Sequence, residues 1–305
     1  MIIDTHVHLF EENMRPRKAG ESLRKHKKGL LSEEDFKKYK PVCGVEALLR
    51  EMDEAGVDVS VCLCSDTAFM YQDEPEIPIW KHNEYVAEAQ AKYPDRIIGF
   101  FGCDPMRPGA VEMLEKGIKE LGLKGVKIAP EWFYPTNENV APFMKKIEEL
   151  DVPVLIHSGT DPLPFRVKYG NPEYLNDLLA TYPKLKIIAA HCSRGWEDLL
   201  IQIMVGGPGR IYTDLSTLQY EHVYSHWHFL MQMRYTMDRV PDGVFFGSDW
   251  PWIKYPPFPS EKEWVNAFKN LKLPQACLDM GMRQFTEEEK NKILGANAQK
   301  LLNLR

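Results

Sequence analysis

Residues 2–9 read IIDTHVHL, a short apolar run that carries two histidines one residue apart. Successive side chains of a β-strand point to opposite faces, so His6 and His8 share a face while Val7 points away. Asp4 lies on the face of the histidines, where it is placed to orient one of them by a hydrogen bond. The pair either converges on a metal ion or forms two hydrogen-bonded core histidines, and the strand alone leaves both open.

Seven further runs of this kind follow, and helical patterns separate them. The predicted strands are residues 2–9, 57–65, 97–104, 123–130, 152–158, 186–192, 210–216 and 243–249. The predicted helices are residues 45–55, 81–93, 110–121, 140–150, 172–182, 196–205 and 222–239. This alternation is typical of an α/β protein with a parallel sheet, and eight strands predict a TIM-type (β/α)8 barrel. A doubly wound open sheet is the alternative, but no glycine-rich phosphate turn follows the first strand.

We expect one domain over residues 1–305, since no linker interrupts the pattern. Residues 10–43 form a charged insertion after the first strand, with a helix start at Ser32. The insertion is either a lid over the barrel mouth or a solvated excursion. Two extra helices are predicted after the eighth strand, the last starting at Thr286.

Composition limits the class of protein. The 305 residues are 44% hydrophobic and 27% charged, with a net charge of -6, which suits a globular domain and disfavours nucleic acid as the partner. A basic run at residues 24–28 is expected to be a solvated helix face. No apolar run is long enough to cross a membrane and no signal peptide is evident, so we expect a cytoplasmic protein with six reduced cysteines.

Three later strands also end in a residue that binds metals. His157, His191 and Asp249 close the fifth, sixth and eighth predicted strands. The carboxyl ends of all strands of a barrel meet at one mouth, where distant residues can surround a single ion. Taken with the paired histidines, these positions predict a metal site at that mouth.

The same residues carry a resemblance to a known family. The motifs are DTHVH at 4–8, GVKI at 125–128, IHSG at 156–159, AH at 190–191, FGSDWP at 246–251 and KILGANA at 292–298. The chain resembles the amidohydrolase superfamily, in the branch that includes aminocarboxymuconate-semialdehyde decarboxylase and related hydrolases. The resemblance implies a metal held by His6, His8, His157 and Asp249. It also implies that His191 contacts the substrate or the metal-bound water, and that homo-oligomers are common.

The predicted cofactor is one divalent ion, zinc, with manganese as the alternative. Such an ion activates water and polarises a carbonyl, and we expect Asp249 to move the proton and neutral His191 to stabilise the developing oxyanion. The leading expectation is hydrolysis of an ester, lactone or amide in a small carboxylated substrate. The alternatives are non-oxidative decarboxylation of an aromatic or unsaturated acid, and a barrel that only binds metal. The residues after His191 read CSRG, where decarboxylases of this branch usually carry a glycine pair, which favours hydrolysis narrowly.

Four further residues are expected to contact the substrate. Arg166 and Arg194 follow the fifth and sixth strands and suit an anionic group, with surface salt bridges as the alternative. Lys127 at the fourth strand is a structural residue, a substrate contact or, if carbamylated, a bridge between two metals. Trp250 either walls the pocket or caps the barrel core.

Overall fold

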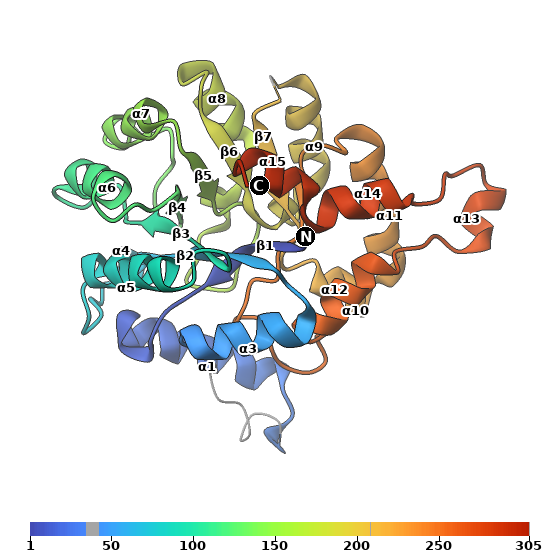
Figure 1. The fold of residues 1–305 in the computed structure, drawn as a ribbon, viewed down its shortest axis with the longest axis horizontal. Coiled ribbons are helices and arrows are strands. Elements are labelled where there is room, and N and C mark those ends of the chain that lie inside the picture. The colour runs from blue at the N-terminus through green and yellow to red at the C-terminus, as the bar shows by residue number, and fades with distance from the viewer. Residues whose placement is uncertain (35–42, 208, 305) are drawn as a thin grey trace.

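The computed structural model describes residues 1–34, 43–207 and 209–304, and its centre is a ring of eight parallel strands (Figure 1). The sheet order follows the chain order, as a (β/α)8 barrel requires. The strands are β1 (Ile3–His8), β2 (Val59–Leu63), β3 (Ile97–Gly102), β4 (Gly125–Ile128), β5 (Pro153–Ile156), β6 (Lys186–Ala189), β7 (Ile211–Asp214) and β8 (Val244–Phe245). All eight lie within predicted strands, and the predicted fold class is confirmed.

Hydrogen bonds between the last strand and the first bring the barrel nearly to closure. The backbone N–H of Thr5 donates to the Phe246 carbonyl at 3.0 Å, and the N–H of Asp249 donates to the His6 carbonyl at 2.9 Å. Residues 246–249 were predicted to continue β8, but Asp249 has a φ of 59° and the strand ends at Phe245. The turn that results sets the Asp249 backbone beside the paired histidines of β1.

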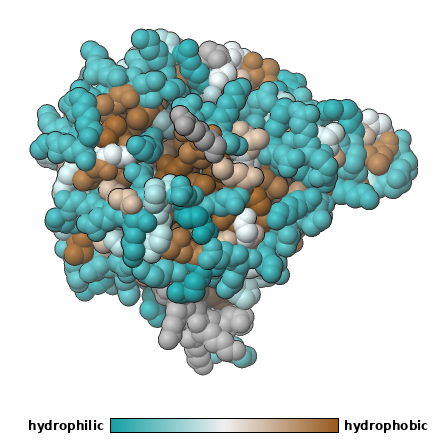
Figure 2. All heavy atoms as spheres, in the orientation of Figure 1, coloured by the Kyte–Doolittle hydropathy of each residue, from teal (hydrophilic) through white to brown (hydrophobic). Residues whose placement is uncertain are grey.

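Helices surround the strands and bury a core between the two layers. They are α3 (Val45–Ala55), α5 (Ile79–Lys92), α6 (Ala110–Lys119), α7 (Ala141–Leu150), α8 (Glu173–Thr181), α9 (Glu197–Gly206), α10 (Gln219–Tyr224) and α11 (His226–Arg239), with one short turn of helix, α4 (Ala68–Tyr71). The predicted helix at 222–239 is two helices, because Ser225 at their junction has a non-helical backbone, with a φ of -152° and a ψ of 63°. In the view of Figure 2 hydrophilic side chains cover most of the outer helices.

The period of two along the strands separates the inside of the barrel from the strand–helix core. Val61 and Leu63 of β2 pack inside, whereas Cys62 and Cys64 pack against the helices. All six cysteines are unpaired, as predicted. By the same alternation Lys127, between two outward-facing apolar neighbours, points into the barrel.

The C-terminal segment closes the end of the barrel opposite the mouth. The extra elements are α12 (Glu261–Lys269), α13 (Gln275–Asp279), α14 (Glu287–Asn291), the π-helical turn η4 (Lys292–Ala296) and α15 (Asn297–Leu301), more than the two helices predicted. Figure 1 shows α15 over the centre of the ring, close to the N-terminus. Ala298 packs on the interior residues, and Gly295 lies so close to the chain start that a Cβ there would be 2.3 Å from the Met1 carbonyl oxygen. A side chain at position 295 would therefore push this closure apart.

The insertion contains η1 (Glu12–Met14) and the helix α1 (Arg17–Leu30), of which only a helical face at residues 24–28 was expected from the sequence. Most of the helix predicted from Ser32 lies outside the described residues. The expectation of a solvated basic face is wrong for Lys27, which is 2% exposed. Within the described part of the chain, no helix is long and apolar enough to cross a membrane.

Candidate metal centre and active site

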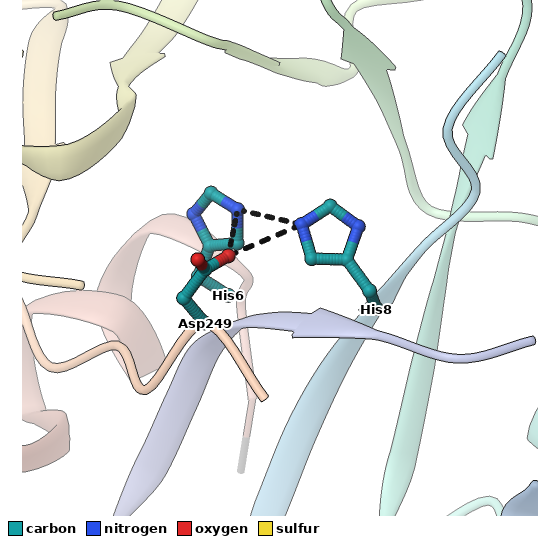
Figure 3. A group of neighbouring side chains, drawn as sticks. All are labelled: His6, His8 and Asp249. Atoms are coloured by element: carbon teal, nitrogen blue, oxygen red, sulfur yellow. Dashed lines mark hydrogen bonds and ion pairs between the residues drawn. The ribbon is translucent and has the colours of Figure 1, made fainter. Parts of the chain in front are cut away.

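The paired histidines of β1 and the aspartate after β8 face one point at the barrel mouth (Figure 3). The Nε2 atoms of His6 and His8 are 3.2 Å apart. Asp249 Oδ1 lies 3.4 Å from the first and 3.2 Å from the second. Three atoms able to ligate a metal therefore form a tight triangle at the end of the barrel interior.

His157, directly after β5, faces the cavity from the other side of the barrel. Its Nδ1 lies 3.2 Å from Nε2 of His191, and its own Nε2 is buried without a hydrogen-bond partner among the described residues. Tyr174 of α8 fixes the local backbone by donating to the His157 carbonyl at 3.0 Å. An unpartnered buried nitrogen is costly, so it calls for a ligand.

The geometry of these residues fits a divalent metal ion. Ligands bonded at about 2.1 Å in tetrahedral or octahedral geometry lie about 3.0–3.4 Å apart. The separations of 3.2–3.4 Å among His6, His8 and Asp249 match that range. The unpartnered Nε2 of His157 is a candidate fourth ligand atom of the right kind, and it lies outside the group of atoms within 4.8 Å of one another that His6, His8 and Asp249 form. That these four bind one ion stays a prediction from the sequence, to which the structure adds this geometry.

Burial sets the charge of the ligand residues. It lowers the pKa of His6 and His8 well below the usual range, with Lys127 as the next cause, and lowers that of His157 to about 3. Imidazoles that stay neutral keep the lone pair that a metal needs. Burial also raises the pKa of Asp249 to about 8, while the positive charge of Lys127 acts against this rise.

Lys127 reaches the same centre from β4. Its Nζ lies 3.4 Å from His6 Nε2, and burial lowers its pKa to about 8, with the nearby acids Asp214 and Asp249 acting in the opposite direction. The side chain lines the cavity above the metal ligands. Its predicted role as a substrate contact stays open.

The residue that orients His6 is not the one expected. Asp4 accepts the backbone N–H groups of His6 and Ser248, both at 3.0 Å, and so ties β1 to the turn after β8. The ring of His6 instead contacts Asp214 at the end of β7, with 2.9 Å between His6 Nδ1 and Asp214 Oδ2. The sequence analysis missed Asp214, although its place at the end of a predicted strand was a usable signal.

Three of the predicted metal ligands, His8, His157 and Asp249, line a cavity of about 200 Å³. Predicted substrate contacts Lys127 and Arg194 line it, as does His191. Arg166 is exposed at the start of η2 (Val167–Gly170) and lies outside the lining. Trp250 is 3% exposed and lines a separate small cavity beside Glu261, so the geometry gives neither residue a substrate contact.

The described part of the insertion lines this cavity, as a lid would, and the prediction of a lid over residues 10–43 stays a prediction. Arg15 and Lys27 reach the lining from the segment before α1 and from α1 itself. Lys27 Nζ donates to the Trp252 carbonyl at 2.6 Å and lies 3.2 Å from the centre of the Tyr255 ring. Neither partner neutralises its charge. The sequence analysis missed both cations.

Aromatic rings form one wall of the cavity. Phe10 and Trp252 stack with ring centres 5.0 Å apart and planes 13° apart, and the Arg15 guanidinium lies 4.0 Å over Trp252. Tyr220 lines the cavity beneath the Arg194 guanidinium, at 4.6 Å. The site thus joins a metal-type ligand set, apolar ring faces and cations in one small space.

Comparison with known proteins agrees with this architecture. A family model described as Amidohydrolase matches residues 3–304. The chain belongs to this amidohydrolase family. It is 24% identical over 226 residues to the gamma-resorcylate decarboxylase of a Rhizobium strain, covering 61% of this chain and 68% of that protein. This amidohydrolase is therefore an enzyme of a family in which a curated relative is a decarboxylase.

Solved structures share the barrel of this amidohydrolase. A 2,6-dihydroxybenzoate decarboxylase complexed with 2,6-dihydroxybenzoate superposes with a TM-score of 0.70 at 16% identity, covering 99% of both chains. A dihydroxybenzoic acid decarboxylase from Polaromonas, with bound manganese and the inhibitor 2-nitroresorcinol, gives 0.67 at 19% identity over 99% of this chain and 97% of the other. These likenesses establish the common fold.

Proposed function

We propose that this amidohydrolase catalyses the non-oxidative decarboxylation of a small aromatic carboxylic acid, using one divalent ion held by His6, His8, His157 and Asp249. The observation that carries the proposal is the cluster of His6, His8 and Asp249, of which His8 and Asp249 line a cavity of about 200 Å³. Apolar cavities of about 150 Å³ already hold benzene, so this one accommodates a single substituted ring.

The relatives favour this reaction over hydrolysis, which was the leading expectation from the sequence. The curated relative and the two solved structures described above are named as decarboxylases of aromatic acids. The same ligand set serves hydrolysis and decarboxylation, and the two proposals differ in the bond that breaks. The residues after His191, which favoured hydrolysis in the sequence, belong to a left-handed turn that begins at His191.

In the proposed reaction the carbon–carbon bond to the carboxylate breaks, carbon dioxide leaves and its electron pair stays on the ring carbon. A bound divalent ion would supply a Lewis acid that holds the substrate oxygens against the floor of the cavity. Asp249 is placed to deliver a proton to the ring carbon, which completes the exchange of carbon dioxide for hydrogen. Lys127 adds positive charge beside the substrate oxygens.

The cavity walls supply the recognition of an acidic ring. Phe10 and Trp252 present flat faces for packing against an aromatic substrate. Lys27 and Arg194 place positive charge near its polar substituents. The predicted role of His191 as a contact to substrate or water stays a prediction, since both of its ring nitrogens have protein partners.

The choice between zinc and manganese rests more on the related structures than on the types of ligand residue. The predicted zinc suits three imidazoles and a carboxylate, but a related structure holds manganese. We propose that manganese supports turnover and that zinc binds at the same four residues.

The test is release of carbon dioxide by metal-loaded protein. Purified protein reconstituted with Mn²⁺ or Zn²⁺ is incubated with dihydroxybenzoates and carboxyvanillate, and in parallel with aryl esters and lactones. We expect carbon dioxide and the decarboxylated phenol from at least one acid, and none from Asp249→Asn. Acid release from the lactone or ester panel, with no carbon dioxide from any aromatic acid, would restore the hydrolase hypothesis.

A further inference from the structure

A chain of buried hydrogen bonds runs behind the metal ligands and starts at one carboxylate, Asp214. This residue is 0% exposed and lies at the end of β7. Its Oδ2 faces His6 Nδ1 at 2.9 Å. Its Oδ1 accepts the backbone N–H groups of Ser216 at 3.0 Å and of His191 at 3.1 Å. Asp214 Oδ1 is therefore held by donors, and because a carboxylate oxygen accepts, His6 Nδ1 is assigned as the donor to Oδ2.

The second branch of the chain passes through Ser216. Its hydroxyl donates to Asp214 Oδ1 and lies 2.8 Å from His191 Nδ1. Because the hydroxyl proton is directed to the carboxylate, the oxygen accepts from His191, whose Nδ1 carries the proton. His191 Nε2 is then an acceptor, and it receives the Nδ1–H of His157 at 3.2 Å.

In this order of donors, Nδ1 of His6 and of His157 carries the proton, and Nε2 of each keeps its lone pair. His6 donates from Nδ1 to Asp214 and keeps a lone pair on Nε2, the atom that faces His8 and Asp249. His157 donates from Nδ1 to His191 and keeps a lone pair on Nε2, the buried atom without a partner. Both lone pairs belong to nitrogens placed to bind the ion.

The backbone supports the His191 branch. His191, Cys192 and Ser193 have φ values of 61°, 50° and 49°, a left-handed turn without glycine that costs free energy. The turn is held by the Ser158 and Ser193 hydroxyls, 2.7 Å apart, and by the His191 N–H on Asp214. It places the imidazole of His191 between Ser216 and His157.

We infer that Asp214 is a positioning residue that sets which nitrogen is protonated in two metal ligands, His6 directly and His157 through Ser216 and His191. The inference rests on the proposed metal-binding role of His6 and His157. It also gives His191 a role that needs no contact with the substrate.

His6, His191 and Asp214 form a second group with spacing suited to a metal. A second ion there would have to compete for Asp214 Oδ1 with the two backbone N–H groups and the Ser216 hydroxyl. Because these donors already occupy Oδ1, the Asp214 carboxylate is better suited to accept hydrogen bonds than to bind a second ion.

The decisive variant is Asp214→Asn. Because both oxygens of Asp214 receive donors, an amide NH₂ on either side meets another donor, and no rotation of the amide restores the pattern. We expect the affinity for Mn²⁺ or Zn²⁺, measured by competition with a chromogenic chelator, to fall about 10- to 100-fold. Thr213→Val is the matched control, since it removes a neighbouring buried hydroxyl that bonds the carbonyls of Ala189 and Asp214 and the Cys192 side chain, and contacts no histidine of the chain of hydrogen bonds. Its metal affinity should match that of the wild type.

A second variant acts mainly on the longer branch. Ser216→Ala removes the acceptor of His191 and the longer contact, 3.2 Å, between Ser216 Oγ and His6 Nδ1. It keeps the shorter contact between Asp214 and His6. In two-bond ¹⁵N correlation spectra of the metal-free protein, His6, His157 and His191 should each carry the proton on Nδ1. In Ser216→Ala the signals of His191 and His157 should change while those of His6 keep the Nδ1–H form.

These measurements do not depend on turnover, so they separate the inference from the proposed reaction. Weaker metal binding in Asp214→Asn without any decarboxylation by the wild type would support the inference and reject the reaction. A metal affinity in Asp214→Asn within threefold of wild type, or a proton on Nε2 of His6 or His157 in the wild type, would overturn the inference. If Asp214→Asn does not fold, the spectra of the wild type and of Ser216→Ala decide alone.

Discussion

Lys27 gives the sharpest prediction about substrate recognition, because its charge is buried in the cavity wall. The side chain is 2% exposed, and its ammonium contacts a carbonyl and an aromatic ring, while Asp249 and Asp161 attract its charge from farther away. A buried charge that no carboxylate contacts in the described part of the chain is unfavourable in the free protein. An acidic substrate entering the cavity would supply such a carboxylate.

The magnitude follows from the strength of a hydrogen bond to a charged group, about 1.5–3 kcal/mol. Since about 1.4 kcal/mol corresponds to a factor of ten, Lys27→Met should raise KM about 10- to 150-fold. The free energy of unfolding should change little, because losing the hydrogen bond to the Trp252 carbonyl destabilises the fold while removing the buried charge stabilises it. Steady-state kinetics on an aromatic acid and urea denaturation measure the two quantities.

The pH dependence checks the same contact. Burial lowers the pKa of Lys27 to about 7, whereas in the unfolded chain it stays near 10.4. The ammonium is therefore lost from the folded protein as pH rises through 7, and KM should rise over that range. A bound divalent ion moves this transition to lower pH, because like charges repel. Lys27→Arg keeps its charge and should show a flat KM between pH 6 and about 9.

One pattern would refute the reasoning about Lys27. If Lys27→Met lowers the stability by more than about 2 kcal/mol while KM stays within twofold of the wild type, the lysine is a structural residue of the lid. The substrate then makes no use of its charge.

Three further predictions concern the metal, the C-terminal closure and the barrel wall. Asp249→Asn should leave the fold intact in circular dichroism but lower bound metal, measured by mass spectrometry, to less than half an ion per chain. Hydrogen bonds from Arg234 lower the pKa of Glu289 to about 2. This pair therefore stabilises the protein above about pH 4.5, and its contribution is lost as the pH falls through 2. The free energy of unfolding of Glu289→Gln, measured by urea denaturation, should lack that acid-dependent loss. Gly102→Ala should destabilise by about 1–3 kcal/mol or more, because its Cβ would lie 2.0 Å from the Cys64 carbonyl oxygen; equal denaturation midpoints would contradict this close approach.

The metal-type cluster was predictable from local sequence because a barrel places the carboxyl end of every strand at one mouth. His6 and His8 share a face by the period of the strand, and Asp249 follows a strand that pairs with their own. No long-range information beyond the strand order was needed to expect these three side chains together. Their contact geometry needed the structure.

The cavity wall could not be predicted in the same way, because it depends on how loops and the insertion pack. Lys27 lies in a basic run whose sequence looks solvated, and only the docking of α1 on the mouth buries it. Arg166 has the right position after a strand, but its loop carries it into solvent. Asp214 ends a strand as Asp249 does, and only the structure shows that it contacts the far side of a histidine ring.

The most direct test of the account is anomalous diffraction from crystals grown with excess Mn²⁺. The account predicts one strong peak at the manganese edge, about 2.0–2.3 Å from His6 Nε2, His8 Nε2, His157 Nε2 and a carboxylate oxygen of Asp249. A peak bound elsewhere, or none at the barrel mouth with manganese in excess, would contradict the metal centre and the chemistry proposed from it.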